Sequence, residues 1–139
     1  MSERYLSALR ALYALAPSGM VLGLDPTRRA LAHFGHPERA FRVAHVAGTN
    51  GKGSTSAMIA RALLASGRRV GLYTSPHLHR FVERVQCDGA PADPDLLGAS
   101  VHRVLAARDA GTIPQLTLFE ATTVAGTASI ALGFYDCNE

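Results

Sequence analysis

Apolar residues recur along several segments of the chain with the spacing of a helix, about 3.6 residues per turn. This pattern predicts helices over residues 3–14, from Asp25 to about Phe34, over about 53–66 and from Asp93 to about Arg108. Two of these begin at an Asp-Pro pair, in which the aspartate caps the helix and the proline takes the first helical position. Thr117 and Glu120 fit a capping box that opens a last helix, and Gly126 and Gly133 predict that this helix weakens toward its end.

Two segments are β-rich, residues 41–47 (FRVAHVA) and residues 69–74 (RVGLYT). The first is mostly apolar, which is typical of a strand buried on both faces of a sheet. A glycine-rich stretch and a helix separate the two segments, so they predict a βαβ unit with parallel strands and a right-handed crossover. Residues 81–87 are predicted to be extended, and Asp88-Gly89 to form a turn. The predicted fold class is α/β, with a P-loop-type βαβ core and an incomplete parallel sheet flanked by helices.

Length and composition narrow the class of protein. The 139 residues are 47% hydrophobic and 18% charged, which indicates a single globular domain. The net charge is +3 and no run of lysine or arginine is present, so no nucleic-acid partner is predicted. No apolar stretch suits a transmembrane helix or a signal peptide, so no membrane partner is predicted and the expected location is cytoplasmic. Cys87 and Cys137 lie far apart and outside any metal-type pattern, which predicts reduced thiols.

The segment at residues 45–54 (HVAGTNGKGS) carries the strongest chemical signal. Gly48, Gly51 and Gly53 are predicted to supply its turns, because glycine adopts positive φ angles and lets the backbone approach an anion closely. Successive backbone N–H groups then form an anion-binding concavity, and the following helix points its N-terminus at the same place. Lys52 adds a mobile charge for terminal phosphates. This combination predicts a loop that binds the phosphates of a nucleotide such as ATP.

The loop departs from the common P-loop pattern, G-x-x-x-x-G-K-[ST], which requires glycine at position 46 and serine or threonine at position 53. The chain has Val46 and Gly53 instead, and Ser54 comes one residue late. A glycine-rich turn with an exposed lysine is the alternative interpretation. The strand predicted before the loop and the helix predicted after it favour phosphate binding.

This departure points to one family. The segment AGTNGKGS resembles the phosphate loop of folylpolyglutamate synthases and dihydrofolate synthases, a branch of the Mur ligase superfamily whose other members usually lack the glycine after the lysine. Further motifs occur in the family's order and cover most of residues 20–125: LGL at 22–24, YTSPHL at 73–78, ERV at 83–85 and LFE at 118–120. The resemblance implies a Mur-ligase-like ATP-binding domain.

Members of this family use ATP and Mg²⁺ to join a carboxylate to the amino group of L-glutamate. The resemblance therefore implies a ligase that adds glutamate to a folate or to dihydropteroate through an acyl phosphate. Carried over by position, Lys52 is the implied catalytic residue and Ser75 the implied Mg²⁺ ligand. The implied ATP-phosphate residues are Gly48, Thr49, Asn50, Gly51, Lys52, Gly53 and Ser54. The implied pterin-side residues are Thr117, Leu118, Phe119 and Glu120, with residues 19–21 as a second stretch.

Several of these residues also have simpler interpretations. Ser75 precedes a proline and suits a turn, Phe119 suits a core position by helical periodicity, and Glu120 is explained as part of a helix cap. Arg84 is predicted to meet either a substrate carboxylate or an acidic neighbour in an exposed salt bridge. The H-x-H at residues 77–79 is not assigned as a metal site, because a histidine in a loop more often makes ordinary hydrogen bonds.

The resemblance divides the chain into a helical lead-in at residues 1–40, a nucleotide-binding core at 41–125 and a tail at 126–139 that departs from the family. The family's E-V-G-x-G-G strand with a second Mg²⁺ ligand, a later histidine ligand and the C-terminal glutamate-binding domain do not occur in this sequence. We therefore expect a truncated or frameshifted chain, catalytically incomplete alone, from a family of monomers. The alternatives are a fragment of a Mur-type cell-wall ligase and a non-catalytic nucleotide-binding fragment.

Overall fold

The computed structural model describes residues 2–16 and 22–135. The second implied pterin stretch, residues 19–21, lies outside these ranges, as do Cys137 and the end of the predicted tail. The helices are α1 (Glu3–Tyr13), α2 (Asp25–His33), α3 (Lys52–Ala65), α4 (Pro94–Asp109) and α5 (Leu118–Tyr135), with 3-10 helices η2 (Pro37–Ala40) and η3 (Phe81–Arg84). The strands are β1 (Gly71–Tyr73), β2 (Val85–Cys87) and β3 (Ala90–Pro91).

The predicted helices are confirmed, and local capping chemistry explains where α4 begins. Asp93 caps α4, because its side chain accepts hydrogen bonds from the backbone N–H groups of Asp95 and Leu96 at 2.8 and 2.9 Å. Asp25 was predicted to be the N-cap of α2, but the N-cap is Leu24, and no described side chain caps this helix. Asp25 is the first helical residue instead. In that position its carboxylate still interacts favourably with the positive end of the helix dipole.

The sheet is small and antiparallel. β1 pairs with β2, with Gly71 opposite Cys87, and β2 pairs with β3. The predicted turn at Asp88-Gly89 is confirmed and joins β2 to β3, with φ angles of 51° and 84°. Two consecutive positive φ angles are typical of the tightest hairpin turns. Residues 81–87, predicted to be extended throughout, divide into η3 and β2.

The strand predicted over residues 41–47 is wrong for this structure, and no parallel sheet occurs among the described residues. Residues 42–48 have no regular secondary structure, and Val43 is 70% exposed. The predicted βαβ unit therefore lacks its first strand, and β1 takes its partner from the segment that follows it. An apolar, extended segment becomes a strand only where a neighbour pairs with its backbone groups. In residues 2–16 and 22–135, no strand pairs with this segment.

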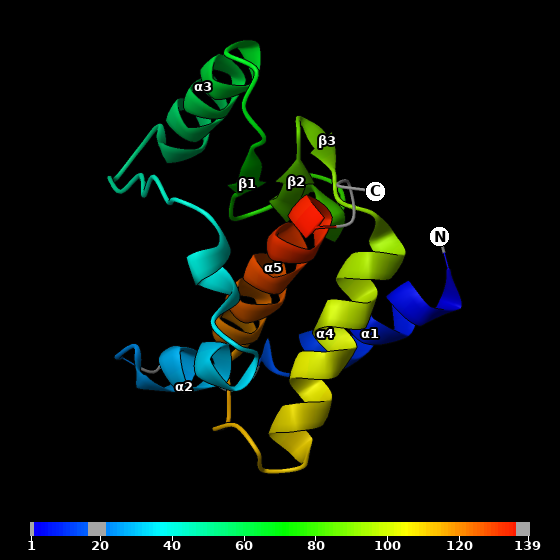
Figure 1. The fold of residues 1–139 in the computed structure, drawn as a ribbon. Coiled ribbons are helices and arrows are strands. Elements are labelled where there is room, and N and C mark those ends of the chain that lie inside the picture. The colour runs from blue at the N-terminus through cyan, green and yellow to red at the C-terminus, as the bar shows by residue number, and fades with distance from the viewer. Residues whose placement is uncertain (1, 17–21, 136–139) are drawn as a thin grey trace.

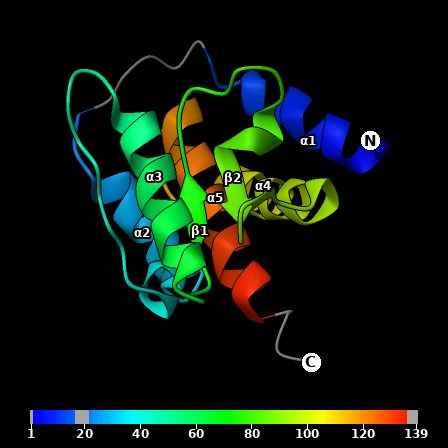
Figure 2. The same cartoon turned by 90° about the horizontal axis from the view of Figure 1, so that it is seen from above.

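Helices α1, α4 and α5 pack on one another and contain much of the hydrophobic core, including Leu12, Leu97 and Val101. The sheet lies between this helical layer and α3, which contacts β1 (Figures 1 and 2). The predicted apolar stripe of α3 is exposed, with Met58 at 65%, and the helix buries Ala60 instead. No helix in the described part of the chain has the length and apolar character needed to cross a bilayer.

Helix α5 continues through both glycines that predicted its weakening, and the close approach of the sheet explains their presence. A Cβ atom at Gly126 would lie 3.1 Å from the Tyr73 ring and 3.2 Å from Cγ2 of Val85. A Cβ atom at Gly133 would lie 3.0 Å from Sγ of Cys87. The absence of side chains at these positions lets α5 lie directly against β1 and β2. Tertiary packing therefore outweighs a helix-propensity penalty of about 1 kcal/mol per glycine.

Candidate functional site

The glycine loop ends at an uncapped helix N-terminus. Gly51 is the N-cap of α3 with a φ of 73°, in the left-handed region that glycine adopts freely, and Lys52 is the first helical residue. No described side chain caps α3, and its first turn contains no acidic residue. The backbone N–H of Thr55 donates to the carbonyl of Gly51 at 2.9 Å, so the N–H groups before it stay available for an anion. Gly53 lies inside this helix, so its predicted role in a turn is wrong.

The side chain of Lys52 folds back over the loop. Its Nζ donates hydrogen bonds to the carbonyl oxygens of Gly48 at 2.6 Å and Thr49 at 3.2 Å. These bonds hold the ammonium group beside the N-terminus of α3, where the helix dipole is positive. Both charges therefore favour a polyanion at this end of the helix. Asn50 and Ser54, also implied as phosphate residues, are exposed.

A cavity of about 120 Å³ brings the glycine loop together with the end of β1. Its lining residues are Val46, Lys52, Gly53, Ser56, Tyr73, Thr74 and Ser75. The lysine implied to bind phosphate and the serine implied to bind Mg²⁺ thus border the same space, although they are far apart in sequence. Gly48, Thr49, Asn50 and Ser54 do not line this cavity.

Arg84 organises the loop that follows β1, a role that sequence reasoning missed. Its Nε donates to Nδ1 of His77 at 2.9 Å, and its NH1 group donates to Oγ of Ser75 at 3.4 Å. The guanidinium carbon also lies 5.4 Å from the centre of the Phe81 ring. Arg84 forms no ion pair with an acidic side chain among the described residues, so the predicted salt bridge is absent there, and the alternative of a substrate carboxylate stays a prediction. No periodic pattern in the sequence predicts that Ser75, His77 and Arg84 lie together, because the path of a loop brings them into contact.

Tyr73 connects the cavity to helix α5. Its hydroxyl lies 3.4 Å from Oγ1 of Thr123, which itself donates to the carbonyl of Phe119 at 2.9 Å. Burial raises the pKa of Tyr73 above its ordinary value, and the hydrogen bond to Thr123 opposes this only in part. The phenol is therefore neutral at physiological pH. Phe119 lies one helical turn before Thr123, so the start of α5 and the cavity share one side of the molecule.

The capping box predicted at the start of α5 is confirmed. The backbone N–H and the hydroxyl of Thr117 donate to Oε2 of Glu120 at 2.8 and 2.9 Å, and the backbone N–H of Glu120 donates to Oγ1 of Thr117 at 3.3 Å. Both side chains are buried, and Leu118 packs against the core. Of the four implied pterin-side residues, Phe119 alone is exposed, at 60%, so its predicted core position is wrong.

Glu83 holds the loop at residues 78–80 through its carboxylate. Oε2 accepts hydrogen bonds from the backbone N–H groups of Leu78 and His79, each at 3.2 Å, and Oε1 accepts one from Arg80 at 3.0 Å. The bond from His79 is the largest of the causes that lower the pKa of Glu83 below its ordinary value. The ionised carboxylate therefore stabilises the segment that follows Ser75.

We expect this loop to loosen in acid. Because the folded state lowers the pKa of Glu83, the stabilisation is fully present above the ordinary glutamate value of about 4.3 and is lost as the pH falls through the lower folded value. Amide proton shifts of Leu78 and His79, followed by NMR from neutral pH into acid, measure the change. Glu83→Gln should give the loosened shifts already at neutral pH, and identical neutral spectra for the two proteins would contradict this role.

No group of three or more His, Cys, Asp or Glu side chains that could hold a metal ion occurs in the described ranges. His77 is engaged with Arg84, and the backbone of His79 with Glu83. The hydroxyl of Ser75 is exposed and borders the cavity, so it offers one oxygen to a hard cation. Ser56 and Thr74, which also carry hydroxyl groups, line the same cavity, and water or phosphate oxygens would complete the coordination of such a cation.

Comparison with known proteins places these features in context. No family model matches the chain. The chain is 38% identical over 135 residues to a probable bifunctional folylpolyglutamate synthase/dihydropteroate synthase of Haloferax volcanii, covering 95% of this chain and 15% of that protein. It is 36% identical over 126 residues to a dihydrofolate synthase/folylpolyglutamate synthase of Bacillus subtilis, covering 88% and 29%. The chain therefore spans less than a third of the length of these relatives.

Solved structures agree with the sequence relatives. The folylpolyglutamate synthase of Thermotoga maritima superposes with a TM-score of 0.81 at 30% identity, covering 92% of this chain and 30% of that one. A bifunctional folylpolyglutamate synthase/dihydrofolate synthase with Mn, AMPPNP and L-glutamate bound gives a TM-score of 0.80 at 34% identity, covering 91% and 30%. The fold is that of a Mur-ligase-like domain. Over most of its length, the chain belongs to the folylpolyglutamate synthase and dihydrofolate synthase family, which confirms the predicted resemblance.

Proposed function

We propose that this chain supplies the phosphate-binding part of an ATP-dependent ligase that joins L-glutamate to the carboxylate of a folate or of dihydropteroate. The observation that carries the proposal is the cavity that Lys52 and Gly53 share with Ser75. The uncapped N-terminus of α3, Lys52 and the exposed residue Ser75 border this cavity. The first two suit phosphate groups and the third suits a divalent cation bound to them.

ATP is the nucleotide that this arrangement supports best. The loop at residues 48–51 and the first turn of α3 would hold the phosphates through backbone N–H groups, with Lys52 moving from its carbonyl partners to the terminal phosphates. Gly53 leaves the first turn open, since apart from its chain neighbours and the adjacent backbone of α3 no heavy atom lies within 4 Å of a Cβ atom at that position. Named relatives of the chain are ligases of this kind, and one neighbouring structure has AMPPNP bound.

Mg²⁺ fits the residues at this cavity only as a partly hydrated ion. Ser75 would contribute its hydroxyl oxygen, with phosphate oxygens and water completing the coordination. When bound, the ion neutralises charge on the phosphates during transfer. The NH1 group of Arg84, 3.4 Å from Oγ of Ser75, would orient that hydroxyl so that a lone pair faces the phosphates.

The proposed reaction has two steps, and the atoms balance in each. An oxygen of the folate or pteroate carboxylate attacks the γ-phosphorus of ATP, the bond to the β-phosphate oxygen breaks, and ADP leaves. The amino nitrogen of glutamate then attacks the acyl carbon, forms the amide, releases inorganic phosphate and loses a proton. Phosphoryl transfer requires positioning and charge neutralisation rather than a protein nucleophile, which agrees with a site made of Lys52, backbone N–H groups and one serine hydroxyl.

The pterin side of the substrate is proposed to lie at the start of α5. Phe119 is 60% exposed and lies one turn before Thr123, whose hydroxyl is near the Tyr73 phenol at the cavity. An exposed aromatic ring in this place suits stacking on a planar heterocycle. Thr117 and Glu120 would act indirectly, because their capping box fixes the first turn of α5 and thereby the direction of Phe119.

Calorimetric titration of the chain with ATP and with AMP, both in the presence of Mg²⁺, tests the phosphate site. We expect ATP to bind at least about tenfold more tightly, because its β- and γ-phosphates add charged hydrogen bonds that AMP cannot make. The two ligands share the adenosine moiety, so the difference reports on phosphates alone. Equal affinities, or no heat with either nucleotide, would contradict the proposal.

A further inference from the structure

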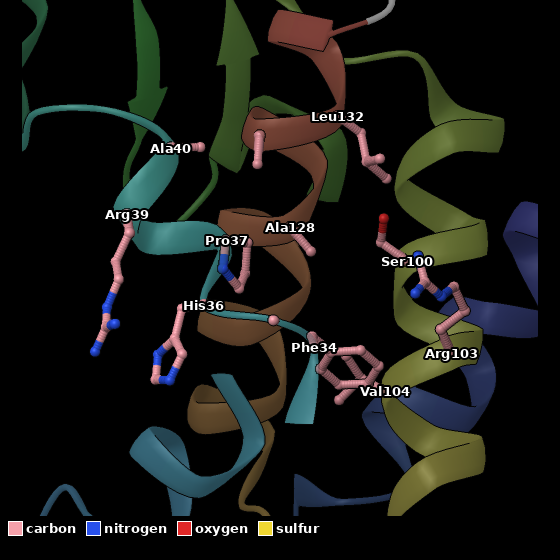
Figure 3. A pocket seen from close by; sticks show the side chains of 12 residues that line it. Phe34, His36, Pro37, Arg39, Ala40, Ser100, Arg103, Val104, Ala128 and Leu132 are labelled. Atoms are coloured by element: carbon pink, nitrogen blue, oxygen red, sulfur yellow. The ribbon is translucent and has the colours of Figure 1, made fainter. Parts of the chain in front are cut away.

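A second cavity lies between η2, α4 and α5, and it shares no lining residue with the cavity at the glycine loop. Its volume is about 440 Å³, which is within the range of small-molecule sites. Figure 3 shows His36 and Arg39 on the side of η2 and Ser100 and Arg103 on the side of α4, with α5 between them. Three elements that are distant in sequence therefore build one concave surface.

Ser100 is the buried polar group of this cavity. The residue is 3% exposed, and its Oγ has no hydrogen-bond partner in the described part of the chain. A serine in a helix can usually donate to a carbonyl one turn back, and most buried hydroxyls are paired. An unpaired hydroxyl at the wall of a cavity is therefore available to a ligand that carries an acceptor oxygen.

Arg103 is the cation of this cavity that lacks an acidic partner. Among residues 2–16 and 22–135, it forms no ion pair, and its guanidinium carbon lies 5.6 Å from the centre of the Phe34 ring. Arg39 differs, because its Nε lies 3.8 Å from Oε1 of Glu38, and the same oxygen lies 2.8 Å from Nδ1 of His36. The planar guanidinium of Arg103 matches the geometry of a carboxylate.

Apart from His36 and Arg39 on the side of η2, the rest of the cavity lining is mostly apolar and includes Phe34, Val104 and Leu132. We infer that this cavity binds a small organic carboxylate with an aromatic or aliphatic body. The carboxylate pairs with Arg103 and accepts a hydrogen bond from the hydroxyl of Ser100, while the body lies against Phe34 and Leu132. This site is separate from the proposed ligase chemistry and stands whether or not the glycine loop binds ATP.

Titration of the isotope-labelled chain with benzoate, followed by amide NMR shifts, tests the site. We expect saturable shifts at Ser100, Arg103 and Leu132, with little change at Lys52. Benzamide has the same ring without the negative charge, and acetate has the charge without the ring. Both should bind at least about fivefold more weakly than benzoate, because each lacks one of the two interactions. Equal binding of benzamide and benzoate, or no saturable shift with millimolar benzoate, would overturn the inference.

Three variants assign the binding to residues. Arg103→Gln should weaken benzoate binding at least about fivefold, whereas Arg61→Gln, an equal loss of charge at an exposed position of α3, should leave it unchanged. Ser100→Ala should weaken binding about threefold or more while the free protein keeps its spectrum, since the substitution removes an unpaired buried hydroxyl. If Arg103→Gln does not fold, the benzoate affinity of Ser100→Ala by itself tests the site. Unchanged affinity in Ser100→Ala and in a folded Arg103→Gln, or equal losses in the two arginine variants, would refute this site.

Discussion

Replacing Lys52 with methionine should weaken ATP binding by about ten- to 150-fold, or 1.5–3 kcal/mol, the usual range for hydrogen bonds to charged groups. Methionine keeps most of the apolar stem and removes the ammonium group, whose Nζ lies 2.6 Å from the carbonyl of Gly48 at the uncapped start of α3. The stability of the fold should change little, because Lys52 is exposed. Calorimetric titration measures the affinity, and circular dichroism monitors the fold.

Arg61→Met is the matched control for this substitution. Arg61 lies on the same helix, is exposed and does not line the cavity, so the change in net charge is equal while the local chemistry differs. Its effect on ATP affinity should stay within about twofold, because an exposed charge farther along α3 is largely screened by salt. Similar losses in both variants would show that attraction to the whole chain, rather than a phosphate site, holds the nucleotide.

Replacing Gly126 with alanine should lower the free energy of unfolding by about 1–3 kcal/mol. The added methyl group would lie 3.1 Å from the Tyr73 ring and 3.2 Å from Cγ2 of Val85, closer than ordinary packing allows. Helix α5 would have to move away from β1 and β2, or the tyrosine ring would have to turn. Urea unfolding followed by circular dichroism measures the loss.

Gly53→Ala is the control, because Gly53 is also helical but, apart from its chain neighbours and the adjacent backbone of α3, no heavy atom lies within 4 Å of a Cβ atom at its position. Alanine there should stabilise the chain by up to about 1 kcal/mol through helix propensity alone. Both substitutions replace glycine with alanine, and their effects on the free energy of unfolding are expected to have opposite signs. A stabilising effect of Gly126→Ala would therefore rule out the tight contact between α5 and the sheet.

Local sequence signals were sufficient for features that depend on a few neighbouring residues. Asp93 caps α4, Thr117 and Glu120 form the predicted box, and Asp88-Gly89 makes the predicted turn, because each depends on hydrogen bonds or φ angles within a few positions. The phosphate loop is predicted in the same way, from glycines and a lysine directly before a helix. The family motifs linked this loop to Ser75, and the structure places Lys52 and Ser75 at one cavity.

Local sequence signals could not predict which distant strands, helices and side chains meet in the folded chain. Residues 41–47 have the composition of a buried strand, but strand formation requires a paired neighbour, and β1 pairs with β2 instead. Gly126 and Gly133 were predicted to weaken the last helix, although they are positions where the sheet approaches α5 closely. Arg84 contacts Ser75 and His77 rather than an acidic side chain of the described residues, because these contacts depend on the path of a loop.

The sequence by itself determined the helices, the caps of α4 and α5, the hairpin turn and the family, because propensity, capping and motif chemistry act over a few residues. The tertiary structure alone decided that the sheet is antiparallel, that α5 packs against it through its glycines, and that Phe119 is exposed. It also decided that Ser100 and Arg103 share a cavity with η2. These features depend on which distant surfaces meet, and that is set by the packing of the whole chain rather than by any one segment.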